Sequence, residues 1–267
     1  MADLDFLAGA LGLPRWSSNS NPCALCQCTG TGPYTWTNCR IDAPWTTTIW
    51  NHATWLSWPN RSQKAIFDVP GVSALTVCVD YMHAKYLGVD QYQFGAVIHI
   101  LVYYLLPNDP QTNLDACWKF IKQWYKDNHI TAGYRYLNKL TMFGKVGKYP
   151  KLRGRACEIK SLGPVLHDLW ATHMSQEVRA HRQIKLTLKL NNTMEVMMAE
   201  YKTSYAFPTE AANRFTEATF AMAQMQAQVS EHYLADPEVK LFDITSKIHH
   251  LSHSVLLSKF INPRVVW

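Results

Sequence analysis

Charged residues are scarce in this chain: Asp, Glu, Lys and Arg make up only 17% of its 267 residues, whereas hydrophobic residues make up 48%. A chain of this composition can bury enough apolar surface to fold, so disorder over most of its length is excluded. Its length suits one large domain or two small ones. The formal net charge of +6 is a mild excess that does not by itself identify a polyanionic partner.

The sequence also lacks a long hydrophobic run and a basic leader. Its most apolar stretch, Phe94 to Leu106, contains His99 and is too short to span a bilayer. Asp3 and Asp5 stand where a secretory signal would carry positive charge. We therefore expect an intracellular protein with no membrane partner, whose cysteines are metal ligands or free thiols rather than disulfides.

Sustained periodicity is missing from residues 14–70, which are rich in Pro, Trp, Asn, Ser and Thr. We interpret residues 1–70 as a Cys- and Trp-rich loop module stabilised by a metal, and residues 71–267 as a second, mainly helical domain. Val72 to Val79 is apolar and β-branched and is the best strand candidate. Apolar residues at helical spacing predict helices near 110–127, 175–205 and 244–260. The expected fold class is mainly α with a small β component.

Four of the seven cysteines lie between Cys23 and Cys39, and Cys23-x2-Cys26 has the spacing of a zinc knuckle. A tetrahedral ion needs two more ligands. Cys39 and His52 complete the pattern C-x2-C-x12-C-x12-H, with Cys28 as a spare thiol. Because the second pair is widely spaced, two alternatives stay open, namely buried thiols without a metal and a redox pair.

Asp80-x2-His83 follows the predicted strand directly. An Asp at the carboxyl end of a strand projects into a cleft where hydrolytic or transfer chemistry can occur. The simpler interpretation, which we favour from these residues alone, is that Asp80 caps a helix whose first turn contains His83.

Further short motifs accompany these two. They are a Leu-Gly-x-Asp sequence at 87–90, a Glu-Ile-Lys-Ser sequence at 158–161 and a K-x-H-x3-H segment at 247–253. Together the motifs resemble the C-terminal part of CACTA-type (En/Spm-like) transposases, in particular diverged transposon-derived reading frames of protists. The resemblance implies a partial RNase H-like α/β core with a helical insertion, DNA as a partner and a nuclear location.

The resemblance also implies a catalytic centre of two Mg²⁺ ions held by two Asp and one Glu. Asp80 and His83 match the family's D-x2-H motif, and Glu158 is the candidate catalytic Glu. Its alternative role is that of a favourable acidic residue in the first turn of a helix. Both catalytic Asp precede the cysteine module in that family, and this chain offers no assignable pair there. We therefore expect a truncated chain that is inactive alone and complements a missing N-terminal catalytic segment or a partner chain. The alternative is a non-enzymatic, zinc-stabilised structural or interaction module.

A glycine-rich basic stretch at 144–155 is predicted to be a loop. Backbone freedom combined with positive charge suits contact with DNA phosphates, and the alternative is a solvated loop with no partner. Its cations are Lys145, Lys148, Lys151, Arg153 and Arg155.

Three histidines lie on the last predicted helix, and two of them, His249 and His253, are four residues apart. This spacing puts two imidazoles on one helix face, where they can bind a metal, although a packed helix face is the commoner outcome. No Glu follows His249, so the H-E-x-x-H pattern of metalloproteases is excluded.

Overall fold

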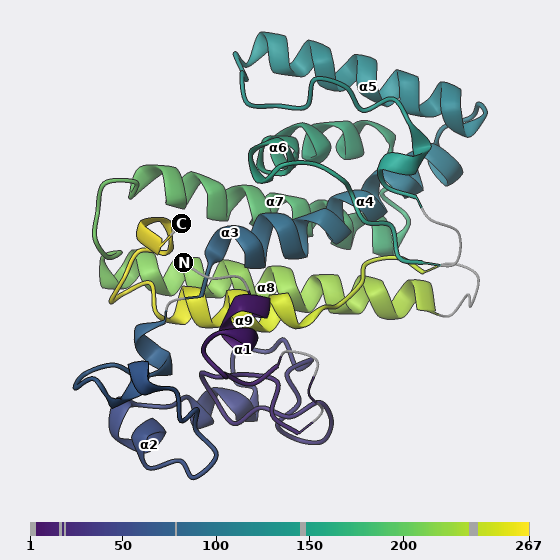
Figure 1. Ribbon diagram of the computed structural model, residues 1–267. Helices are drawn as coiled ribbons and strands as arrows, with labels where there is room; N and C mark the ends of the chain where they lie inside the picture. The colour runs from purple at the N-terminus through teal and green to yellow at the C-terminus, as the bar shows by residue number, and fades with distance from the viewer. Residues whose placement is uncertain are drawn as a thin grey trace. The chain divides into compact units, whose positions relative to one another are not determined.

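The computed structural model describes residues 4–15, 18, 20–77, 79–144, 148–234 and 240–266. These residues are mainly helical (Figure 1). The chain forms two compact units: unit 1 is Met1–Ala84, Tyr201–Phe220 and Ser246–Trp267, and unit 2 is Lys85–Glu200 and Ala221–Thr245. The boundary that we predicted after residue 70 therefore differs from the observed one, because two later segments pack with the N-terminal segment in unit 1.

Unit 1 consists of short helices and long loops. Its elements are α1 (Leu4–Gly9), η1 (Pro44–Thr48), α2 (His52–Leu56), η2 (Ala65–Asp68), η3 (Ala74–Thr76), α3 (Tyr81–Ala84), the first part of α8 (Thr209–Leu234), α9 (Ser246–Leu256) and η7 (Pro263–Val266). The loop-rich character predicted for the N-terminal segment is confirmed. Local caps and buried aromatic rings stabilise it: Asn51 and Thr54 form a capping box, and the rings of Trp55 and Phe67 lie 5.0 Å apart.

The strand predicted at Val72–Val79 is wrong. Ser73 accepts a hydrogen bond from the backbone N–H of Leu75, and Thr76 donates back to Ser73, so these residues start a 3-10 helix. Among the described residues there is no sheet, only the isolated bridges Cys26–Ile49 and Thr29–Thr35. A β-branched run without a partner strand has no ladder to join, and local capping decides its conformation. The small β component is thus corrected to isolated bridges, and Cys78 lies outside the described residues.

Unit 2 contains the longer helices. They are the π-helix η4 (Lys85–Asp90), α4 (Gln91–Ile100), a second π-helix η5 (Leu101–Leu105), α5 (Pro110–Asp127), η6 (Leu140–Met142), α6 (Ala156–His173), α7 (Arg179–Glu200) and the second part of α8. The amphipathic helix predicted near 110–127 is confirmed: Asp109 caps it and its apolar stripe is buried. The helices predicted near 175–205 and 244–260 correspond to α7 and α9. No described helix is both long and apolar enough to cross a bilayer.

A buried polar network lies between η4 and α7. The ammonium of Lys85 is fully buried and lies 2.8 Å from Asp90 Oδ2, 2.9 Å from Glu195 Oε1 and 2.9 Å from Asn191 Oδ1. Asn191 donates to the other oxygen of Asp90, and the hydroxyl of Tyr86 donates to Glu195. Burial opposes the Lys85 charge, but the two carboxylates outweigh this effect and raise the pKa of Lys85. The charge in the core of unit 2 is therefore neutralised by protein groups alone.

We expect Lys85→Met to destabilise the protein by about 3–5 kcal/mol, because Asp90 then stays buried without a cation and Glu195 keeps only Lys160, 3.4 Å away. The free energy of unfolding in urea measures this loss. Lys189→Met is the matched control, since Lys189 is exposed on α7 and its replacement removes the same charge without uncovering a buried partner. Equal losses in the two variants would contradict the structural role of the network.

Candidate metal centre

Three cysteines and one histidine of unit 1 meet in a buried cluster, which we call the Cys3His cluster. Its members are Cys23, Cys26, Cys28 and His249, and the ligating atoms of all four lie within 4.8 Å of one another. The three thiols are 0% exposed and the imidazole is 2% exposed. Among the described residues this is the one group of Cys, His, Asp and Glu side chains arranged to hold a metal ion.

The loop 23–28 supplies the thiols from a tight turn. The backbone N–H of Leu25 donates to Cys23 Sγ at 3.3 Å, which orients that sulfur. The carbonyl of Leu25 accepts from the backbone N–H of Trp50, and Cys26 pairs with Ile49 in an isolated bridge. The loop is thus held by backbone contacts, and the C-x2-C spacing turns its sulfurs to the same side.

Helix α9 supplies the imidazole and is buried along most of its length although it is rich in polar residues. His249 Nε2 lies 3.3 Å from Cys26 Sγ. One turn later, His253 Nε2 lies 3.5 Å from Cys23 Sγ and 3.2 Å from His249 Nε2. His250 points elsewhere, and its Nδ1 pairs with the Ser246 carbonyl at 2.8 Å. The four-residue spacing of His249 and His253 therefore directs both rings to the thiols.

The ring of Trp45 closes the cluster against solvent. Trp45 is 1% exposed, and its ring lies edge-on to the His249 ring with centroids 4.3 Å apart. It also lies 5.3 Å from the His253 ring and stacks on Phe220. The indole N–H of Trp45 donates to the Asn38 carbonyl, which fixes the ring in place. A site covered in this way excludes water.

The three neighbouring thiols shift one another's pKa values, so that ionisation of one opposes ionisation of the other two. Burial raises the pKa of Cys23, but its hydrogen bonds with Cys26 and Cys28 and the two nearby histidines lower it well below its ordinary value. Burial and the neighbouring Cys23 raise the pKa of Cys26, and hydrogen bonding to Cys23 raises that of Cys28. Burial also lowers the pKa of His249 to about 4, so its imidazole is neutral at neutral pH. The protein groups alone stabilise one thiolate here, and a cation is required to hold three.

The chemistry of the donor set fits a divalent metal. Tetrahedral zinc sites made of three thiolates and one imidazole are a standard structural type, and the thiolate and the neutral imidazole are the forms that ligate. Hard ions such as Mg²⁺ prefer oxygen ligands, which this cluster does not contain. The cluster can therefore hold a metal such as zinc.

Of the predicted ligand set, one pair lies in the Cys3His cluster and the other lies outside it. Cys23 and Cys26 lie in the cluster as expected from their spacing, whereas Cys39 and His52 do not. Cys39 Sγ instead donates to the Thr37 carbonyl, and His52 is exposed in the first turn of α2. Cys28, the spare thiol of the sequence pattern, and His249 complete the cluster instead. A C-x2-C-x-C spacing and an H-x3-H spacing were both visible in the sequence, but nothing in it indicated that they meet.

Asp80 and His83 form a local helix cap. Asp80 Oδ1 accepts from the backbone N–H of His83 at 3.1 Å, and Oδ2 lies 2.8 Å from His83 Nδ1. Both groups therefore have partners within the first turn of α3, as the capping interpretation predicts. They belong to unit 1 and are not among the groups arranged to hold a metal.

Glu158 has an equally local role in unit 2. Its carboxylate accepts from the backbone N–H of Arg155 at 2.8 Å and pairs with the Arg155 guanidinium at 3.0 Å, which forms a capping box at the start of α6. Slight burial raises the pKa of Glu158, but Arg155 lowers it by a larger amount. The first-turn interpretation of Glu158 is thus confirmed.

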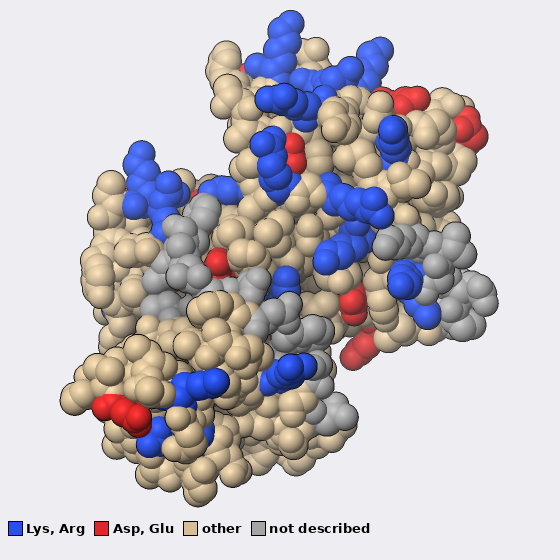
Figure 2. All heavy atoms as spheres, in the orientation of Figure 1, with Lys and Arg blue, Asp and Glu red and all other residues tan. Residues whose placement is uncertain are grey.

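The predicted basic residues lie in unit 2, except that Lys145 falls outside the described residues. Lys148, Lys151, Arg153 and Arg155 are exposed on the segment that precedes α6, which has no regular structure. Figure 2 shows that Lys and Arg side chains are spread over the visible surface, with fewer Asp and Glu side chains among them.

Comparisons with protein-family models, curated proteins and solved structures found no match to this chain.

Replacing Asp80 by Ala removes the cap of α3, and we expect it to lower stability by about 0.5–2 kcal/mol. Asp80→Asn keeps an acceptor oxygen and is expected to lose less. Thermal unfolding followed by circular dichroism measures both changes. Metal content should stay the same in both variants, and loss of metal on Asp80→Ala would contradict the assignment of Asp80 as a cap only.

Proposed function

We propose that unit 1 is a non-enzymatic, zinc-stabilised module in which Cys23, Cys26, Cys28 and His249 hold one structural Zn²⁺. The observation that carries this proposal is the convergence of four buried ligands within 4.8 Å from two segments far apart in the sequence. Chance clustering of cysteines does not bring in an imidazole from a helix 223 positions away.

A structural role is favoured over a catalytic one by the composition and closure of the site. Catalytic zinc sites keep one coordination position open to water or substrate, whereas sites with four protein ligands are closed. Here all four ligands come from the protein, and Trp45 covers the two imidazoles that face the thiols. Zinc is suited to a dry thiolate site because it has no redox chemistry of its own.

The proposed zinc links the loop 23–28 to helix α9. The segment around the loop has few regular elements and short helices, so its own packing provides little cooperative stability. Holding Cys26 next to His249, 223 positions later in the chain, costs conformational entropy. The metal–ligand bonds offset this cost. The site therefore takes the role that a continuous hydrophobic core has in a larger domain.

In this proposal His253 is not a ligand. Its Nε2 lies 3.5 Å from Cys23 Sγ, a distance suited to an N–H···S hydrogen bond with a metal-bound thiolate. Such hydrogen bonds reduce the charge on the sulfur and orient it, which is the usual contribution of groups outside the coordination sphere. His249 and His253 thus have different roles although both face the thiols.

Transposase ancestry stays a separate prediction. It requires a two-metal carboxylate centre. Of the two carboxylates assigned to it, Asp80 caps the start of α3 and Glu158 completes the capping box in the first turn of α6. Nothing in the described residues favours it over the zinc module. Nicking of DNA by the purified chain with Mg²⁺ or Mn²⁺, lost on Asp80→Ala, would support it.

Metal analysis tests the proposed zinc site. We expect about one zinc per chain in the purified wild-type protein, and well below one in Cys26→Ser, because removal of one ligand of four lowers the affinity by orders of magnitude. Substitution with Co²⁺ should give thiolate-to-cobalt absorption bands in the wild type and not in Cys26→Ser. Chelation should unfold unit 1, which loss of helical circular dichroism would record.

Cys39→Ser is the matched control, because Cys39 is also a buried thiol of the same segment but lies outside the cluster. It should retain the zinc. His249→Gln should lose zinc, whereas His253→Gln should retain it with altered cobalt bands. A wild-type protein without bound zinc that also fails to take up Co²⁺ would overturn the proposal, as would equal metal loss in Cys26→Ser and Cys39→Ser.

A further inference from the structure

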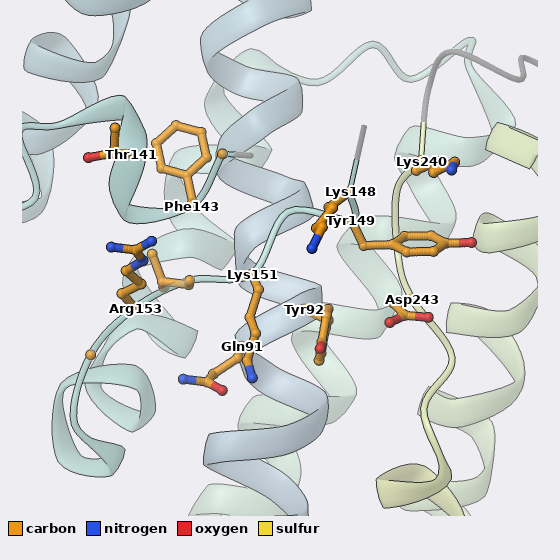
Figure 3. Close-up of a pocket in the computed structure, with 13 residues that line it drawn as sticks. Gln91, Tyr92, Thr141, Phe143, Lys148, Tyr149, Lys151, Arg153, Lys240 and Asp243 are labelled. Atoms are coloured by element: carbon orange, nitrogen blue, oxygen red, sulfur yellow. The ribbon is translucent and has the colours of Figure 1, made fainter. Parts of the chain in front are cut away.

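A groove of unit 2 combines positive charge with aromatic rings, and it is independent of the Cys3His cluster. Its volume is about 680 Å³, within the range of about 300–1,000 Å³ that small-molecule sites occupy. Its walls come from the start of α4, from residues 141–144 and 148–154, and from the segment that precedes α9 (Figure 3). Its charged side chains are Lys148, Lys151, Arg153, Lys240 and Asp243, and two tyrosine rings, Tyr92 and Tyr149, lie among them.

The charge of the groove is strongly positive. Four Lys or Arg side chains line it against the single carboxylate of Asp243, a formal excess of three positive charges. Among the described residues, no carboxylate lies within ion-pair distance of Lys148, Lys151, Arg153 or Lys240. Single exposed Lys side chains elsewhere in the described part of unit 2, such as Lys119 and Lys189, have no ion pair either. Here, however, four cations line one cavity with a single carboxylate, and an anionic ligand would balance that excess of charge.

The segment that carries three of these cations is held in place by backbone contacts. The N–H groups of Lys151 and Arg153 donate to the carbonyls of Phe143 and Met142, and that of Leu152 donates to Gln91 at 2.9 Å. Gly95 permits this approach, since a Cβ at that position would lie 3.0 Å from both the Pro150 carbonyl oxygen and the Leu152 nitrogen. The cations are therefore displayed from a fixed strip of chain on α4.

Aromatic rings lie among these charges. Lys151 Nζ lies 5.4 Å from the centroid of the Tyr92 ring, and Figure 3 shows the Tyr149 ring extending toward Asp243. Burial and the nearby Asp243 charge raise the pKa of both tyrosines, which stay neutral at neutral pH. Burial raises the pKa of Asp243 itself. The groove thus offers cations for phosphate, flat rings for stacking and one carboxylate as a hydrogen-bond acceptor.

We propose that this groove binds a nucleoside diphosphate, with the phosphates on Lys148, Lys151 and Arg153 and the base against Tyr92 or Tyr149. Phosphate groups are the anions that clustered Lys and Arg recognise best, and Arg binds them with two parallel hydrogen bonds. Base stacking on aromatic side chains supplies the rest of the affinity. A bare phosphate would leave most of the volume and both rings unused.

Calorimetric titration of the full chain at low ionic strength tests this proposal, with ADP, GDP, CDP and UDP as separate probes. We expect at least one of the four nucleotides to bind saturably at one site. If that nucleotide is ADP, adenosine and inorganic phosphate should each bind with an affinity at least about tenfold lower. Affinity should fall as salt is raised, because the contacts are ionic. No binding of any of the four at millimolar concentration would overturn the proposal.

The double variant Lys151→Gln/Arg153→Gln should weaken binding at least about tenfold, since each lost charge-assisted contact has roughly this effect. Lys119→Gln/Lys126→Gln is the matched control, because it removes the same charge from exposed positions of α5 outside the groove. It should bind as the wild type does. Equal weakening in both would show a general charge effect and overturn the site. Tyr149→Leu should weaken nucleotide binding more than pyrophosphate binding.

A ten-nucleotide single strand and a DNA duplex distinguish a free nucleotide from a polynucleotide. If the oligonucleotide binds and none of the four nucleotides does, the groove is a strand-binding surface and the proposal is wrong. Circular dichroism of each variant verifies the fold. Because the zinc ligands lie in unit 1, zinc content reports on the other proposal separately.

Discussion

The close approach of three buried thiols is the constraint on which unit 1 depends. Cys23, Cys26 and Cys28 cannot all ionise in a dry site without a cation. If the three thiols stayed protonated, the neutral imidazole of His249 would have no metal to bind although its nitrogen faces them. The zinc that we propose would resolve this by offsetting the charge. Helix α9, which is polar yet buried along most of its length, fits this arrangement. His249 and His253 face the sulfurs, His250 pairs with the Ser246 carbonyl, and Ser252 and Ser254 donate to the backbone of the helix itself.

The two units neutralise buried charge by different means. In unit 2 the ammonium of Lys85 is matched by Asp90 and Glu195, so a complete network of protein groups suffices. Among the residues of unit 1 that the structure describes, no Lys or Arg pairs with the thiols, and a metal is the group that fits. The groove of unit 2 is a third case, in which exposed cations have no protein carboxylate within ion-pair distance among the described residues. An unbalanced charge points to a ligand only where, as here, a cavity and aromatic rings accompany it.

Features that depend on neighbours in the sequence were predictable. The stripe of α5 follows from helical periodicity, and Asp109, Asp80 and Glu158 act as caps because their partners lie two or three residues away. The predicted strand failed for the same reason, since a serine-based cap within it formed a 3-10 turn where no partner strand was present to compete. Cys39 and His52 were chosen by spacing along one segment, and spacing cannot reveal a ligand that another segment supplies.

The sequence by itself determined the helical class, the caps and the knuckle turn that presents Cys23 and Cys26, because each of these is a local property of the backbone and its nearest side chains. Only the tertiary structure decided that His249 and Cys28 complete the cluster and that the cations near 148–153 share a groove with Tyr92 and Asp243. Those groups are brought together by packing of segments distant in the chain, and periodicity and motif spacing carry no information about which distant segments meet.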